Sequence, residues 1–161
     1  MSGISEAVRA WAKGSCPLEA GVELLIAHGR AIDDGAPWLI ALNDKEPGTS
    51  GRPSQVMVDV DELVGGTGAW SGGEQRIVAV AASLLSPERP VNLNDALPGL
   101  DRAGLELVLA ALAHASGSHE HSGVVTDELG VMVGFERLNS LYPWPPAATS
   151  RLPSTGHGPG L

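Results

Sequence analysis

The chain has 161 residues, a hydrophobic content of 43% and a net charge of −9, which together fit one globular domain that folds without cross-links. No apolar run approaches the roughly 18 residues of a membrane-spanning helix, and the first residues lack the basic and apolar pattern expected of a secretory signal. The ten basic residues are scattered singly, which argues against nucleic-acid binding. A single cysteine, Cys16, excludes an internal disulfide, so we expect a cytoplasmic protein.

The N-terminal part of the chain predicts two helices. Ser5 is expected to cap a short first helix. A second helix is expected over residues 17–28, because Pro17 suits the first turn of a helix and Gly29 suits its end. The apolar face of this second helix consists of Val22, Leu25 and Ile26.

The middle of the chain is expected to be mostly irregular. Residues 33–55 carry frequent Gly, Pro and Asp and predict a loop, interrupted by an apolar patch at residues 38–42 that must pack on another part of the protein. The β-branched run at residues 56–60 predicts a short strand. The glycine-rich segment 65–68 is expected to break the chain as a flexible connector.

Two further helices are expected to form the centre of the core. Ser71 and Glu74 make a capping box before a helix over residues 71–86. Asp101 is expected to cap a helix over residues 101–115. The apolar spacing predicts that the first helix buries Ile77, Val80, Ala81, Leu84 and Leu85, and that the second buries Leu105, Val108, Leu109 and Leu112.

The remaining segments predict short strands and a tail. Residues 90–93 are expected to be extended, and residues 124–125 and 131–133 are expected to pair as a hairpin. From residue 143 the composition turns to Pro, Ser, Thr and Gly, which is typical of disorder. The pattern as a whole predicts a predominantly helical α+β domain over residues 1–142, with its best-defined core at 71–116 and a disordered tail at 143–161.

One hexapeptide resembles a known motif. Ser71-Gly72-Gly73-Glu74-Gln75-Arg76 is similar to the signature motif of ABC-type ATPase domains, and residues 70–127 resemble the signature, Walker B and D-loop part of such a domain. In that family the signature acts across a dimer, on a nucleotide held by the partner. The resemblance implies that a nucleotide would be contacted in trans by Ser71, Gly72, Gly73, Asp95 and Asp101.

The chain departs from that family where catalysis takes place. Ala96 occupies the position of the catalytic glutamate, and Asp127 lies where the family carries its switch histidine. No phosphate-binding loop of the form G-x-x-x-x-G-K-[ST] occurs, so nothing cradles the β- and γ-phosphates. The same Ser-Gly-Gly-Glu sequence is also a good helix start, and this structural role competes with the nucleotide reading.

A second resemblance covers more of the chain. Residues 18–117 are similar to a group of actinobacterial proteins associated with phages and mobile elements, through the segments 22–30, 71–74, 81–84 and 95–101. This resemblance implies a family without implying an activity.

The histidines suggest a metal site. His114, His119 and His121 form a cluster with metal-like spacing, although a solvated loop explains the same residues. Cys16 precedes a predicted helix start, where a thiol pKa is expected to fall, but no histidine is tied to it by a motif.

The leading functional hypothesis is a non-catalytic interaction or regulatory module that needs no cofactor and binds another protein. Its interaction residues are expected to be the tryptophans Trp38, Trp70 and Trp144. Two alternatives stay open: an accessory fragment that completes the ATP site of a partner, and a metal-binding regulator that uses the histidine loop.

Overall fold

Six α-helices and two antiparallel strand pairs make up the part of the chain that the computed structural model describes, residues 3–42 and 53–146. None of the described helices is long and apolar enough to cross a membrane. The predicted tail from residue 147 onward and the loop at 43–52 lie outside the described residues. In chain order the elements are α1 (Gly3–Ala12), α2 (Cys16–His28), β1 (Leu39–Leu42), β2 (Gln55–Val58), α3 (Val60–Gly66), α4 (Gly72–Leu85), α5 (Leu93–Ala96), η1 (Leu97–Gly99), α6 (Arg102–Ala115), η2 (Ser118–Glu120), β3 (Ser122–Thr126) and β4 (Met132–Arg137).

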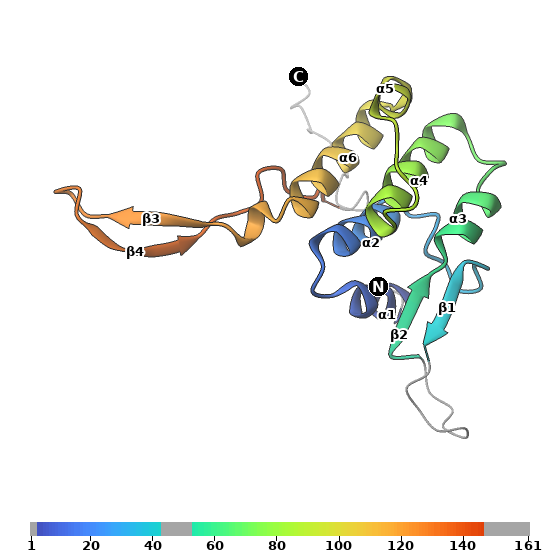
Figure 1. Ribbon diagram of the computed structural model, residues 1–161, viewed down its shortest axis with the longest axis horizontal. Coiled ribbons are helices and arrows are strands. Elements are labelled where there is room, and N and C mark those ends of the chain that lie inside the picture. Colours follow the sequence, from blue (N-terminus) through green and yellow to red (C-terminus); the bar gives the residue numbers. More distant parts are fainter. Residues whose placement is uncertain (1–2, 43–52, 147–161) are drawn as a thin grey trace, which may run out of the picture.

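The predicted α+β fold is confirmed, and α2 lies at its centre (Figure 1). Its most extensive contacts are with α4 and α6, the two helices expected to form the core. Leu24 and Leu25 of α2 are fully buried. The approach of α2 to α4 is close at Gly21, where a Cβ atom would lie 2.8 Å from Cγ of Leu85. A glycine therefore lets these two helices cross at short range.

The ends of α2 agree with the expectation from sequence, whereas the start of α1 does not. Pro17 lies in the first turn of α2, and Gly29 follows its last residue with a φ of 83°, a left-handed conformation that favours glycine. Ser5 does not cap α1, because the helix already begins at Gly3. The side chain of Ser5 is buried against the core instead.

The apolar patch at residues 38–42, expected only to interrupt a loop, contributes Trp38 to the core and forms the strand β1. β1 and β2 pair in antiparallel register, with Leu39 opposite Val58. β2 ends two residues earlier than predicted, because Asp59 caps α3 by accepting a hydrogen bond from the backbone N–H of Glu62 at 3.0 Å. The strand therefore leads directly into a helix.

The glycine-rich segment at residues 65–68 is not a flexible connector. Gly65 and Gly66 belong to α3, and Thr67 is buried with its hydroxyl donating to the carbonyl of Leu63 at 2.8 Å. A Cβ atom on Gly66 would lie 2.8 Å from the ring of Trp38. The glycine serves close packing on this ring.

Both predicted capping arrangements are present, but the segment between the two helices differs. The capping box of Ser71 and Glu74 starts α4, and Asp101 accepts a hydrogen bond from the N–H of Gly104 at 2.7 Å. The predicted extended segment is one residue shorter than expected: Asn92 has an extended backbone, and the short helix α5 begins at Leu93, with the side chain of Asn92 capping it.

The face that α6 buries is not the one expected from its leucines. The buried residues are Gly104, Val108, Ala110 and Ala111. Leu105, Leu109 and Leu112 are each 39% exposed. α6 packs on α2 through small side chains, and the larger leucines lie at the edge of this contact. Each leucine follows a buried residue by one position, which is about 100° around the helix.

β3 and β4 form the predicted hairpin, which projects from the helical body as an arm (Figure 1). Val124 pairs with Phe135, and a β-bulge follows Val125. The chain then returns to the body, where Trp144 packs against the core. Described structure thus continues past the predicted domain boundary at residue 142, as far as Pro146.

Candidate functional site

The arm, residues 122–137, carries apolar side chains that the rest of the molecule does not cover. Leu129 at its tip is 88% exposed and Phe135 in its middle is 70% exposed. In the described part of the chain, β3 and β4 pair only with each other, so both strands have an open edge. The large exposed apolar residues on the arm and at its root are Val124, Leu129, Val131, Met132, Val133, Phe135, Leu138, Leu141 and Tyr142.

The arm is locally well formed at both ends. At the tip, Asp127 closes the turn: its Oδ1 accepts hydrogen bonds from the N–H groups of Leu129 and Val131, each at 2.9 Å. At the root, the N–H of Leu138 donates to the carbonyl of His121 at 2.9 Å. Asp127, which the ABC-like resemblance aligned with a switch histidine, thus shapes the turn of the arm.

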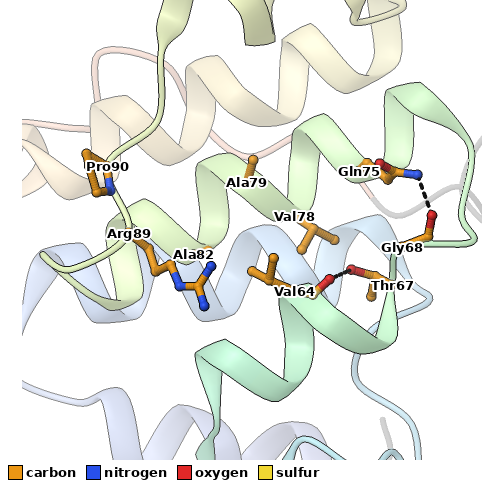
Figure 2. A pocket seen from close by; sticks show the side chains of 9 residues that line it. All are labelled: Val64, Thr67, Gly68, Gln75, Val78, Ala79, Ala82, Arg89 and Pro90. Carbon is orange, nitrogen blue, oxygen red and sulfur yellow. Dashed lines mark hydrogen bonds between the residues drawn. The ribbon is translucent and has the colours of Figure 1, made fainter.

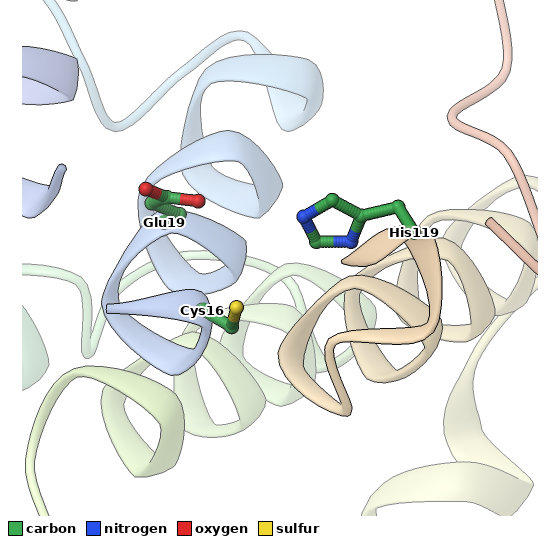
Figure 3. Close-up of side chains that lie close together, drawn as sticks. All are labelled: Cys16, Glu19 and His119. Carbon is green, nitrogen blue, oxygen red and sulfur yellow. The ribbon is translucent and has the colours of Figure 1, made fainter. Parts of the chain in front are cut away.

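A group of potential metal ligands lies beside the root of the arm. Cys16 and Glu19 come from the first turn of α2, and His119 comes from η2, which directly precedes β3. One potential ligand atom from each lies within 4.8 Å of the others. Figure 3 shows the ring of His119 directed toward the thiol of Cys16 and the carboxylate of Glu19.

His114 supports this group from α6. Its Nε2 lies 3.1 Å from Oε2 of Glu19, and its ring packs against that of His119 in a tilted arrangement with centroids 4.3 Å apart. The other carboxylate oxygen of Glu19 accepts a hydrogen bond from the N–H of Gly14 at 2.8 Å. The Gly14 amide first, and His114 second, lower the pKa of Glu19 below its ordinary value.

The structure therefore changes the metal site expected from sequence. His114 and His119 lie together, but His121 is not in the group and occupies the start of the arm. The thiol pKa of Cys16 is raised, not lowered, first by burial and then by the carboxylates of Glu120 and Glu19. Burial disfavours the charged thiolate, and the two nearby carboxylates repel it, so together they raise the pKa of the Cys16 thiol despite its place at a helix start.

The signature-like segment forms the start of α4 and is already occupied by protein groups. The carboxylate of Glu74 accepts hydrogen bonds from the Ser71 N–H at 2.9 Å and from Arg30 at 2.7 Å. Arg30 in turn lies over the ring of Trp70, 4.5 Å from its centroid. Ser71 therefore caps α4 together with Glu74, whose negative carboxylate lies at the helix start that a phosphate would approach.

The other two residues of the ABC-like resemblance, Asp95 and Asp101, also take part in contacts that support the fold. Asp95 lies in α5, and its carbonyl accepts a hydrogen bond from Nε of Arg76 at 3.2 Å. The Arg76 side chain also covers Gly99, where a Cβ atom would collide with it. Asp101 caps α6. These contacts tie α4 to the α5–η1 turn.

The three tryptophans expected to bind a partner are engaged within the molecule. Trp38 is 7% exposed, and its Nε1 donates to the carbonyl of Ala31 at 2.8 Å, which corrects the expectation that it is available. Trp70 contacts Trp38 edge to face and stacks on His28. Trp144 is partly buried, and its Nε1 donates to Nδ1 of His114 at 3.4 Å.

A small pocket between α3 and α4 offers little chemistry (Figure 2). Its volume is about 280 Å³, at the lower end of the range for ligand sites. The Thr67 hydroxyl and the Gln75 amide already donate to backbone carbonyls, and Arg89 is paired with Asp61. The Thr67 hydroxyl, the Gln75 amide and Arg89 thus already have partners within the described part of the protein.

Comparison with known proteins finds no matching family model, no matching curated protein and no matching solved structure.

Two features of the candidate sites were missed by reasoning from sequence. The exposure of the arm was missed because a hairpin pattern does not say which face finds a neighbour. Cys16 and Glu19 were missed as partners of His119 because about 100 residues separate them in the chain. A signal was present, since Cys16 directly precedes the helix predicted over residues 17–28 and lies three residues before Glu19, a spacing that places two side chains on one face if the helix begins at Cys16.

Proposed function

We propose that the protein is a non-catalytic interaction module whose arm joins it to a second copy of the same chain. The observation that carries this proposal is the projection of a two-stranded hairpin with uncovered apolar side chains. An isolated two-stranded hairpin is marginally stable in water, and an exposed apolar patch of this size marks an interaction surface.

The distribution of the apolar residues along the arm fits a two-fold pairing. They occur at the tip (Leu129 and Val131), in the middle (Val124 and Phe135) and at the root (Leu141). If two arms pair antiparallel about a two-fold axis, the tip of one lies against the root of the other and the middles meet. Each apolar group then finds an apolar neighbour on the second copy.

The exposed area is sufficient for a stable dimer. Val124 and Phe135 are directly opposite each other, so their side chains share one face of the hairpin. Each exposed apolar side chain offers on the order of 100 Å² of accessible area. The nine such side chains among the described residues of the arm and its root therefore offer about 900 Å². A stable protein interface buries about 800 Å² on each partner.

Charge gives this proposal a distinct signature. Each copy carries a net charge of −9, so like-charge repulsion opposes association at low salt. Added salt screens that repulsion and leaves apolar contacts in place. We therefore expect the dimer to become stronger as salt rises, whereas binding to a basic partner would weaken.

Sedimentation velocity of the full chain over a range of concentrations tests the proposal. The wild type is expected to sediment as a dimer, and Phe135→Ser is expected to dissociate at concentrations where the wild type does not. Leu93→Ser, which changes an exposed leucine on α5, is the matched control and is expected to stay dimeric. A wild-type chain that is monomeric at every concentration and salt, or a Phe135→Ser variant that remains fully dimeric, would contradict the proposal.

A further inference from the structure

The side chains beside the root of the arm are the donor types that zinc prefers. A thiol, a carboxylate and an imidazole converge from Cys16, Glu19 and His119. Zinc is bound in proteins by these three groups, and a soft thiolate disfavours magnesium and calcium. Tetrahedral zinc requires donor atoms about 3.5 Å apart. The three ligand atoms now lie within 4.8 Å of one another. Rotation of the three side chains about their χ angles would bring these atoms about 1 Å closer together.

We propose that Cys16, Glu19 and His119 bind one zinc ion and leave the fourth coordination position to water. The proposal does not depend on the oligomeric state. It differs from the histidine-loop hypothesis in its ligands, since α2 contributes two of the three and His121 contributes none.

The charges of the ligands balance that of the ion. Zinc binds the thiolate of Cys16, so the thiol proton is released to solvent when the ion arrives. One thiolate and one carboxylate together neutralise a dication, and the neutral imidazole of His119 adds no charge. A complex without net charge suits a partly buried position between α2 and η2.

The surroundings hold the ligands in orientation. Glu19 is fixed by the N–H of Gly14 and by Nε2 of His114, and metal-binding carboxylates are commonly hydrogen-bonded in this way. The ring of His119 packs against that of His114, and its Nδ1 is buried without a hydrogen-bond partner among the described residues. A surface pocket of about 340 Å³ borders the group on the side of Glu19 and His114.

A zinc ion at this position would link the body to the root of the arm. Cys16 and Glu19 belong to α2, the central helix of the core, whereas His119 lies three residues before β3. Binding would therefore restrict the direction in which the arm leaves the body. The ion acts here as a structural clamp.

Titration of tag-free, chelator-treated full-length protein with Zn²⁺ in a calorimeter tests the site. We expect one ion per chain for the wild type, and a loss of affinity of at least about tenfold in Cys16→Ser and in His119→Gln. His121→Gln is the matched control, because His121 is a neighbouring histidine outside the group, and it is expected to bind as the wild type does. Far-UV circular dichroism of each variant checks that the helices are intact.

Co²⁺ provides a second readout that reports the thiolate itself. The wild type and His121→Gln are expected to show thiolate-to-cobalt charge-transfer absorption, and Cys16→Ser is expected to lack it. Absence of Zn²⁺ binding by the folded wild type overturns the proposal, as does unchanged binding in Cys16→Ser or His119→Gln. The Phe135→Ser variant should bind Zn²⁺ with wild-type affinity, so failure of the dimer and failure of the metal site are distinguishable.

Discussion

Glu74 shows how one residue combines helix capping with a longer-range contact. Its carboxylate closes the capping box with Ser71 and pairs with Arg30, which follows the end of α2. The Arg30 guanidinium, followed by the Ser71 N–H, lowers the pKa of Glu74 from its ordinary value of 4.5 to about 2. A motif that resembles a nucleotide signature in sequence thus contributes to the junction between α2 and α4.

The depressed pKa gives Glu74 a pH-dependent role in stability. A carboxylate whose folded-state pKa lies below its unfolded value stabilises the fold above the unfolded pKa, and this contribution is lost as pH falls toward the folded one. Glu74→Gln should therefore lower the urea midpoint at pH 7, and the difference from wild type should narrow below pH 4.5 and vanish near pH 2. Urea titrations at several pH values measure this. The control Glu128→Gln, at an exposed turn of the arm, should leave the midpoint at pH 7 unchanged. A difference that stays constant with pH would contradict the assignment.

At the scale of a secondary-structure element, α6 shows that the most hydrophobic stripe of a helix is not always the buried one. Gly104, Val108 and Ala111 face α2 and α4, and a Cβ atom on Gly104 would lie 3.2 Å from Cδ1 of Ile77. The neighbouring leucines lie one residue further round the helix and remain partly exposed. Close approach of the helices selects the small side chains.

This orientation predicts an unusual order of stability losses in α6. Val108 is 0% exposed and Leu109 is 39% exposed, so Val108→Ala should destabilise the protein by about 2 kcal/mol and Leu109→Ala by less than about 1 kcal/mol. The larger truncation should thus have the smaller effect. Denaturant unfolding of both variants at equal protein concentration measures the difference. The reverse order would show that the leucine stripe is buried.

At the scale of the whole molecule, the body and the arm have separate roles. The large buried side chains lie in the body, around α2 and including Leu24, Leu25 and Leu63. The hydrogen bond from the N–H of Leu138 to the carbonyl of His121 closes the root of the arm. Beyond it, β3 and β4 contact mainly each other. The body can therefore keep its core without the arm.

Excision of the arm should separate folding from association. If a short Gly-Ser linker replaces residues 122–137, we expect the helical circular dichroism to persist and the unfolding free energy to change by no more than about 1 kcal/mol at low protein concentration. The same variant should no longer self-associate in sedimentation velocity. Loss of helical structure on excision would show that the arm is part of the fold.

Much of the local structure follows from the sequence alone. The sequence predicts the helices α2, α4 and α6 and the β3–β4 hairpin, because caps, apolar spacing and turn residues act within a few positions of one another. Pro17 and Gly29 bound one helix, and Asp101 begins another. The expectation of a predominantly helical α+β fold rested on these local signals and is confirmed.

The tertiary structure decided which surfaces meet. It buried Trp38 against Gly66, turned the leucines of α6 outward, and brought Cys16 and Glu19 to His119. Each outcome depends on contacts between residues far apart in the chain, where small side chains permit an approach that hydrophobicity alone does not indicate. Interactions between residues close in the chain therefore determined the predicted helices and the hairpin, and packing between distant segments determined the candidate sites.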